Sequence, residues 1–346
     1  HPAPSKKQIE ELMFGNQQSV AGWFKENSQG KFEIESAGTL GWYESKRPAE
    51  HYWGPPDEGD KDGDGFIGGH TEKWTEAIRM AEKEFDFAKF DKNKNGILES
   101  DELGIIFVIP QNGPFGTMRT PAGREHPNWE PLIVQGVEIP AITEAYAGSP
   151  PNLGLFAHEL AHLLLDAPDM YMKSIYRAGV YSLMDASYFP CHLGAFEKLK
   201  LGWLKPQVIQ KSGVYDLKNI ETNGDVLILY DEKRGKEEYF LVENRWRMSS
   251  YYAGGVFMDG LAIWHIIEDP KTFNSLPNLP GSSGDWARNG IRLLRANNGD
   301  PLDDSYALFT RGQICEPKWA NGTLSGFRIE MLGNLGAFVR VRVERK

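Results

Sequence analysis

The amino-acid sequence predicts an α+β protein in which a helix-containing part, residues 1–206, precedes a β-rich part, residues 207–346. Two observations support this prediction. The first part contains segments with apolar residues three or four positions apart, most clearly at 71–90, 151–169 and 194–206. From residue 207 onward, apolar and polar residues alternate in short segments separated by turn residues, which is typical of an antiparallel β-sandwich.

The first part should open with two short helices. Ser5 and Gln8 have the spacing of a capping box, so a helix should begin there and stop at Gly15. An amphipathic segment at 18–25 predicts the second helix. Residues 111–150 are rich in Gly and Pro and should be loop. Strands are expected at residues 31–36, 39–45 and 104–110, and in the β-rich part at 214–218, 225–231, 238–246, 261–267, 291–296, 327–332 and 337–344.

Composition and charge limit the classes of function. The chain of 346 residues, 40% hydrophobic and 12% aromatic, is typical of an ordered globular protein. Its net charge of −10 argues against a nucleic-acid partner held by phosphate contacts. No apolar run reaches the roughly 18 residues of a membrane span. The chain begins at His1 rather than Met, and we interpret it as a mature form cut from a longer precursor.

Two Asp-rich segments have the spacing of EF-hand loops, in which oxygen ligands alternate and a final Glu binds calcium through both oxygens. The ligands expected in the second loop are Asp91, Asn93, Asn95, Ile97 and Glu102, with Gly96 at the sharp turn. Those expected in the first loop are Asp60, Asp62, Asp64, Phe66 and Glu72, the last standing one place late. Both loops should bind Ca²⁺ in a stabilising role, and the alternative is a pair of Asn/Asp/Gly-rich turns.

The segment 151–169 carries the pattern most typical of a metal site. His158 and His162 are four residues apart, so a helix places both imidazoles on one face, with Glu159 beside them. This H-E-x-x-H pattern binds zinc in metallopeptidases, although it also occurs by chance. The helix is apolar nearly all round and should be buried. Two histidines and a glutamate are costly in such a helix unless they have a partner, which a metal ion would supply.

Several stretches, in this order, resemble the M6 family of metallopeptidases, the immune inhibitor A type of secreted bacterial zinc endopeptidase. They are HELAH at 158–162, APDMY at 167–171, YSLMD at 181–185, AFEKLKLGWLKP at 195–206, YFLVENR at 239–245 and GLAIWHI at 260–266. The resemblance implies a zincin-type catalytic domain at 1–206, which includes the calcium loops at 60–102, with Met184 in a turn beneath the zinc. It also implies secretion, protein or peptide substrates, and a propeptide in the precursor.

A catalytic zinc has three protein ligands and one open position. In the family, the helix continues with a Gly and then Pro-Asp. Here Leu165 stands at the place of that Gly, and Pro168-Asp169 comes one residue later. Matching the Pro-Asp pair implies Asp169 as the third ligand. The other carboxylates and histidine that remain open for this role are Asp166, Asp185 and His265.

The expected reaction is hydrolysis of peptide bonds, in which zinc activates a water and polarises the carbonyl while Glu159 takes and passes on the proton. Tyr171, Tyr181 and Tyr188 are candidates to stabilise the oxyanion. One alternative is a zinc amidase or esterase acting on a non-peptide polymer. Another is a calcium-stabilised binding module whose catalytic part is inactive. No G-x-S-x-G motif is present, which disfavours a serine hydrolase.

Only two cysteines occur, Cys191 and Cys315. In a secreted protein they could form one disulfide, and the alternative is two separate buried thiols.

Overall fold

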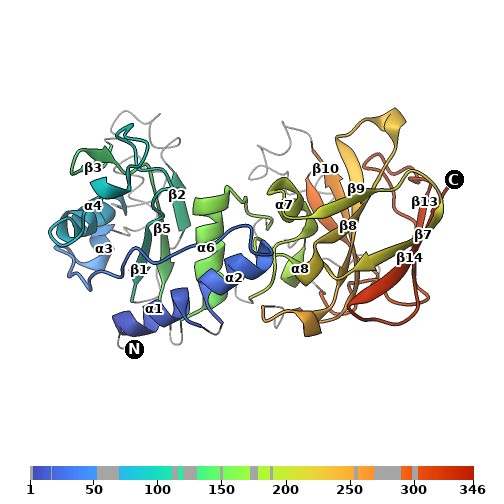
Figure 1. Cartoon of the computed structure of the whole chain (residues 1–346), viewed down its shortest axis with the longest axis horizontal. Coiled ribbons are helices and arrows are strands. Elements are labelled where there is room, and N and C mark those ends of the chain that lie inside the picture. Colours follow the sequence, from blue (N-terminus) through green and yellow to red (C-terminus); the bar gives the residue numbers. More distant parts are fainter. Residues whose placement is uncertain are drawn as a thin grey trace. The chain divides into compact units, whose positions relative to one another are not determined.

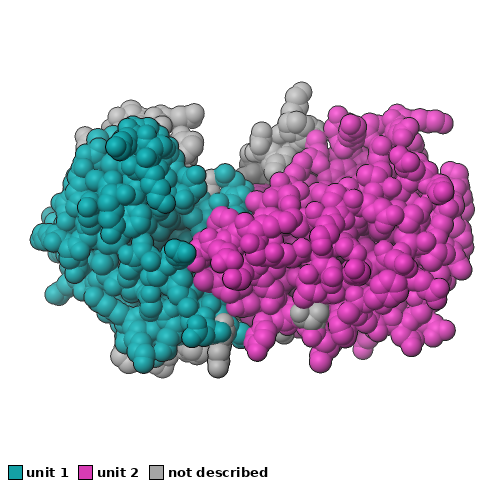
Figure 2. Space-filling model, in the orientation of Figure 1, with its two compact units in different colours: residues 1–20, 35–167 teal, residues 21–34, 168–346 magenta. Residues whose placement is uncertain are grey.

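The computed structural model describes residues 3–16, 18–52, 70–110, 116–119, 131–148, 151–171, 178–187, 190–252, 256–268, 290–297 and 303–346. These residues form a mixed α+β structure with helices and several sheets, as the sequence predicts (Figure 1). The chain divides into two compact units, residues 1–20 with 35–167 and residues 21–34 with 168–346 (Figure 2). Among the described residues, no helix is long and apolar enough to span a membrane.

The first unit contains helices at its start and end. Helix α1 (Lys6–Phe14) begins with the predicted capping box, in which Gln8 N donates to Ser5 Oγ at 3.2 Å and Ser5 N to Gln8 Oε1 at 2.8 Å. Helix α4 (His70–Ala81) ends before residue 90, so the prediction of one helix over 71–90 is wrong. The other helical elements of this unit are α3 (Ala49–Tyr52), the 3₁₀ turn η1 (Ala88–Phe90) and α6 (Leu153–Leu165).

A three-stranded sheet lies beside α6 in the first unit. Its order is β1 (Ile106–Ile109), β5 (Ala141–Tyr146), β2 (Gly116–Arg119), with β5 parallel to β1 and antiparallel to β2. Strand β1 confirms the strand predicted at 104–110. The central strand β5 lies in the stretch predicted to be loop, so that prediction is wrong there. Helix α6 packs on β5 and β2, which places its buried face against the sheet.

Two predicted strands of the N-terminal part are absent, since residues 31–45 form no strand among the described residues. The aromatic side chains of this stretch have other partners. The Phe32 ring lies 5.5 Å from Phe24 and 6.4 Å from Trp203 between centroids, and Trp42 Nε1 donates to Pro4 O at 2.9 Å. The alternating pattern therefore reflects packing of single side chains and not a hydrogen-bonded ladder.

The second unit contains two sheets. The first has the order β11 (Ile291–Leu294), β10 (Gly260–Ile267), β9 (Glu238–Arg245), β8 (Asp225–Tyr230), β6 (Lys205–Val208). The second has the order β12 (Ile314–Cys315), β13 (Phe327–Leu332), β14 (Phe338–Arg345), β7 (Gly213–Lys218). All seven strands predicted after residue 207 are present, with ends displaced by a few residues. The sequence missed β6, whose residues are all exposed, and the two-residue β12.

The two sheets of the second unit share one hydrophobic core. Leu227, Phe240 and Ile263 of the first sheet lie in the same buried cluster as Ile329 and Val341 of the second. Shared burial of this kind is what the predicted sandwich requires. However, β6 pairs with β8 in parallel, so the expectation of an entirely antiparallel arrangement is wrong for this pair.

The compact units do not divide the chain at residues 206 and 207, where the sequence places the domain boundary. Helix α7 (Ala195–Lys200) contacts β9 and β10, so it belongs to the second unit. Most of α2 (Val20–Asn27) belongs there too, because Trp23 Nε1 donates to Cys191 O at 2.8 Å. The second unit also contains the short α8 (Ile220–Asn223) and the 3₁₀ turns η2 (Gly179–Tyr181), η3 (Glu232–Arg234) and η4 (Arg247–Ser249).

Candidate metal centre

Helix α6 carries the H-E-x-x-H motif and has well-defined ends. Asn152 caps the N-terminus, where its Oδ1 accepts a hydrogen bond from Leu155 N at 3.2 Å. The helix ends at Leu165, and Asp166 follows in the left-handed conformation with φ of 55°. Asp tolerates this region better than most residues. Asp166 thus supplies the left-handed turn one residue after Leu165, the position at which the M6 pattern has Gly. Pro168-Asp169 is displaced from the Pro-Asp of that pattern by the same one residue.

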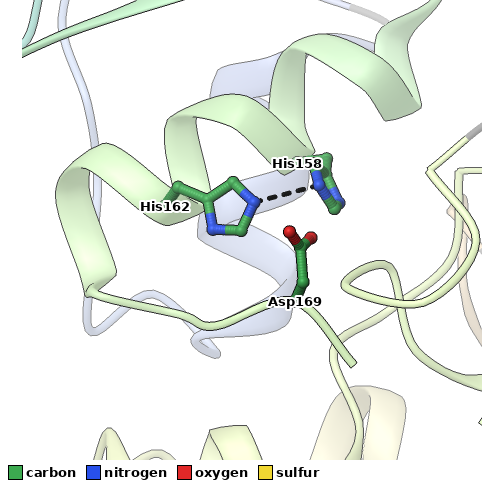
Figure 3. A group of neighbouring side chains, drawn as sticks. All are labelled: His158, His162 and Asp169. Carbon is green, nitrogen blue, oxygen red and sulfur yellow. Dashed lines mark hydrogen bonds between the residues drawn. The ribbon is translucent and has the colours of Figure 1, made fainter. Parts of the chain in front are cut away.

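The two motif histidines and Asp169 form a compact group (Figure 3). One potential ligand atom from each of His158, His162 and Asp169 lies within 4.8 Å of the other two. The Nε2 atoms of His158 and His162 are 3.1 Å apart, and both rings face the Asp169 carboxylate in Figure 3. His158 is buried, whereas the other two residues are half-buried. The structure therefore brings together the three zinc ligands implied by the family resemblance.

A backbone carbonyl fixes the orientation of the His162 ring. His162 Nδ1 lies 2.6 Å from Ala167 O, and only a protonated nitrogen can donate to a carbonyl. In the neutral ring, the lone pair is then on Nε2, which faces His158. Metal-binding histidines usually have their second nitrogen fixed in this way. Sequence reasoning missed Ala167, because a backbone acceptor leaves no signal in residue type.

The other candidates for the third ligand lie outside this group. Asp166 terminates α6. Asp185 accepts hydrogen bonds from Ala178 N and Gly179 N on its Oδ2. The Asp185 carboxylate therefore holds the start of the η2 turn.

His265 is hydrogen-bonded on both ring nitrogens. Its Nε2 lies 2.8 Å from Glu238 Oε1, and its Nδ1 lies 3.0 Å from Arg292 Nη2. Burial lowers the pKa of His265, which keeps the ring neutral between these two charges. This is the arrangement of a structural histidine in a strand, and it leaves neither nitrogen for a metal ion.

Glu159 and Met184, the two other residues that the sequence assigns to the site, are both buried. Glu159 is 2% exposed and lies on α6 directly after His158. Met184 is fully buried, and its carbonyl accepts a hydrogen bond from Met170 N at 2.8 Å. The turn that contains Met184 is therefore bonded to the residue that follows Asp169.

The three tyrosines proposed for the oxyanion have different environments. Tyr181 is fully buried, and its hydroxyl donates to Asp304 O at 3.0 Å. Burial, together with the charge of Asp304, raises the pKa of this phenol. Tyr171 is 40% exposed and follows Asp169 closely in the chain. Tyr188 lies outside the described residues. Of the two described tyrosines, Tyr171 is the better candidate, because the Tyr181 hydroxyl is buried and already bonded.

The second Asp-rich loop folds around its own carboxylates. Asp91 accepts from Asn95 N at 3.2 Å and from Gly96 N at 3.0 Å, while Glu102 Oε1 accepts from Lys92 N at 2.8 Å. Gly96 has φ of 79°, as the sharp turn requires. Of the remaining expected ligands, Asn93 Oδ1 accepts from Asn95 N at 2.9 Å, and Ile97 forms a bridge to Glu138.

This loop is joined to the core of the first unit rather than flanked by two helices. Leu98 N donates to Glu138 O and Glu138 N to Gly96 O, both at 2.8 Å. The Leu98 side chain is buried in a cluster with Trp74 and Ile142. A 3₁₀ turn precedes the loop and β1 follows it, as expected for a loop fastened to a sheet.

The first Asp-rich loop lies almost entirely outside the described residues, including Asp60, Asp62, Asp64 and Phe66. Glu72 is described, and its Oε2 lies 2.7 Å from His51 Nε2. This carboxylate, expected to close the first loop, therefore has a histidine partner on α3.

The two cysteines are free and buried, so the expectation of a disulfide is wrong. Cys191 lies beside α2, whereas Cys315 lies in β12 within the core of the two sheets. Burial raises the pKa of each thiol to about 12. Both side chains therefore behave as small apolar residues, which is the alternative reading of the sequence.

Comparison of the chain with known protein families, with curated proteins and with solved structures found no match. The resemblance to the M6 family therefore remains a prediction from the sequence stretches themselves.

Proposed function

We propose that this protein is a secreted zinc endopeptidase that resembles the M6 family and hydrolyses peptide bonds of proteins. The observation that supports the proposal most is the group of His158, His162 and Asp169, whose potential ligand atoms lie within 4.8 Å of one another. The proposal includes a zincin-type arrangement, in which α6 lies against the β1-β5-β2 sheet and the Met184 turn adjoins the Asp169 segment.

The geometry of the group fits a zinc ion. Two nitrogen ligands of a tetrahedral zinc lie about 3.3 Å apart, because each Zn–N bond is about 2.0–2.1 Å. The two Nε2 atoms are 3.1 Å apart, so a small adjustment of either ring would suffice. Two imidazoles and one carboxylate also form a donor set that zinc prefers. The hydrogen bond from His162 Nδ1 to Ala167 O leaves the correct nitrogen for coordination.

The residues of the chain would divide the chemistry as follows. His158, His162 and Asp169 would hold the ion, which supplies Lewis acidity toward a water molecule and the scissile carbonyl. Glu159 would take a proton from the attacking water and donate it to the leaving amine. Tyr171, which follows Asp169 closely in the chain and is 40% exposed, would donate to the oxyanion.

We also propose that the loop from Asp91 to Glu102 binds Ca²⁺ and stabilises the first unit. The proposal is supported by the loop's ligand spacing and by side-chain oxygens of Asp91 and Asn95, which accept backbone N–H groups and so fold the loop around them. The loop is anchored to β4 (Val137–Glu138), so an ion there would stabilise the attachment of the loop to the core.

Metal analysis and casein digestion test the proposed function. The wild-type protein should contain about one zinc per chain and should digest casein until a zinc chelator is added. Glu159→Gln should keep the zinc and lose activity by at least about 100-fold, the lower range for loss of a general base. Glu232→Gln, a change of the same kind at an exposed site, should have wild-type activity.

The other outcomes separate the alternatives. Zinc without casein digestion would favour an amidase or esterase acting on a non-peptide polymer. Absence of zinc from protein prepared without chelators would favour the binding module. A Glu159→Gln variant with full activity would contradict the role assigned to Glu159.

A further inference from the structure

The backbone directly after Asp169 is bonded to a turn, residues 178–185, that we call the Met184 turn. Met170 N donates to Met184 O at 2.8 Å, so the residue after Asp169 is bonded directly to this turn. Within the turn, Asp185 accepts from Gly179 N at 2.6 Å. Any residue that fixes the Met184 turn therefore also limits where the Asp169 carboxylate can lie.

Arg245, on β9, fixes one side of the Met184 turn. Its side chain is 1% exposed, and its Nη2 donates to Tyr181 O at 3.0 Å and to Leu193 O at 3.2 Å. Its Nε donates to Glu243 Oε1 at 2.6 Å, and Trp264 Nε1 donates to the same oxygen at 3.0 Å. The guanidinium thus joins two backbone segments, and its own direction is fixed by a buried carboxylate.

Asp304 fixes the other side of the turn. Its Oδ2 accepts from Val180 N at 2.9 Å, its carbonyl accepts from the Tyr181 hydroxyl, and its Oδ1 accepts from Arg295 Nη1 at 2.6 Å. Gly179 has φ of 58°, and a Cβ atom there would collide with the Asp304 carboxylate. The backbone of the turn is therefore pressed against Asp304, and only glycine allows this approach.

Burial of Arg245 needs an explanation beyond stability. A buried ion pair is often no more stabilising than apolar residues of the same volume, because both charges lose their water. An apolar side chain at position 245 could fill space, but it could not bond two backbone carbonyls at once. Arginine has a planar fork of donors suited to such bridging. We therefore attribute to the buried Arg245 guanidinium the role of fixing the position of the Met184 turn.

We infer that Arg245 and Asp304 are positioning residues of the proposed metal site. They hold the Met184 turn from its two sides, and the turn holds Asp169 at ligand distance through Met170. All of these contacts lie within the second unit. The inference rests on the proposed function, since it assumes that Asp169 binds zinc.

Zinc affinity of two variants tests this inference, measured by competition with a chromophoric chelator. Arg245→Lys keeps the charge but cannot donate to both carbonyls with a fixed geometry. Asp304→Asn has only one acceptor oxygen, so it cannot accept from both Val180 N and Arg295 Nη1. Each should weaken zinc binding roughly 10- to 100-fold, as changes behind metal ligands do. Arg342→Lys is the matched control, because Arg342 also pairs with a glutamate in the second unit but is 43% exposed. Its zinc affinity should be that of the wild type.

The outcomes distinguish this inference from the proposed function. Folded Arg245→Lys and Asp304→Asn variants with wild-type zinc affinity would overturn the positioning role, provided that His162→Ala does lose zinc. If the wild type binds no zinc, the proposed function itself fails. If Arg245→Lys does not unfold cooperatively, Asp304→Asn decides alone, because Asp304 lies on a loop with its side chain 13% exposed.

Discussion

Two pairs of histidines in this chain differ in what holds their ring nitrogens. In the first pair, His192 and His265, each ring lies between a cation at Nδ1 and a carboxylate at Nε2. The partners are Lys198 and Glu26 for His192, and Arg292 and Glu238 for His265. Both rings are fully buried, and both nitrogens are bonded to other side chains, so these two histidines are structural.

The second pair, His158 and His162, has a different arrangement. His162 Nδ1 is bonded to the Ala167 carbonyl, while its Nε2 lies 3.1 Å from His158 Nε2. With the His162 proton on Nδ1, the facing nitrogens can share either one proton or one cation. Burial alone therefore does not identify a metal-binding histidine. What identifies one is a nitrogen that is directed toward other potential ligand atoms.

The largest effect that this comparison predicts concerns zinc binding. His162→Ala removes a proposed ligand and should weaken zinc binding by more than about 100-fold, beyond the range seen for changes behind the ligands. Chelator competition measures the affinity. His265→Gln is the matched control and should bind zinc as the wild type does. If His265→Gln lost zinc and His162→Ala kept it, the two pairs would have been assigned in reverse.

How far the sequence predicts the fold depends on whether one face of an element is buried. The alternation of Val339, Val341 and Val343 with polar residues predicts strand β14, and in the structure these three side chains are buried. The central strand β5 was missed, because four consecutive residues of it are buried and no alternation remains. Its neighbours rich in Gly and Pro then favoured a loop.

In the candidate site, the sequence predicts the relation between residues that are close in the chain, but not the contacts between distant ones. The spacing of His158 and His162 fixes their relation, because a helix repeats every 3.6 residues. The choice between Asp166 and Asp169 depends on where α6 ends. The sequence does not predict that Asp166 adopts the left-handed backbone conformation that ends the helix. The role of His265 depends on strand pairing, since β10 and β11 place it directly opposite Arg292.

A second prediction concerns acid stability and sharpens the assignment of the structural pair. Burial, and then the charge of Lys198, lowers the pKa of His192 from its ordinary value of 6.5 to about 3. Below pH 6.5 the unfolded chain therefore binds a proton that the folded chain does not bind. Stability should fall with decreasing pH, by about 1.4 kcal/mol per pH unit for this one histidine.

Substitution of His192 tests this slope. His192→Gln removes the group that binds this proton in the unfolded chain. Between pH 6.5 and about pH 5 the loss of stability should therefore be smaller by about 2 kcal/mol than in the wild type. Urea unfolding at several pH values measures it. His265→Gln should change the slope in the same direction, because burial also lowers the pKa of His265. A His192→Gln variant with the wild-type slope would mean that the His192 ring is already protonated in the folded state.

The smallest expected effect concerns the loop from Asp91 to Glu102, which shares a property with each pair of histidines. Its side chains are bonded to backbone N–H groups, as structural residues are, and their oxygens also match an ion-binding pattern. Ca²⁺ at about ten times its dissociation constant should stabilise the wild type by about 1.4 kcal/mol. Glu102→Gln should abolish this gain. It should change the calcium-free stability little, because the Gln carbonyl can still accept from Lys92 N and Asn93 N.

Asp101→Asn, which removes the same charge one residue away, should keep the calcium effect. Thermal unfolding with and without Ca²⁺ measures all three proteins, and an equal calcium effect in Glu102→Gln would make this loop a turn closed by its own hydrogen bonds.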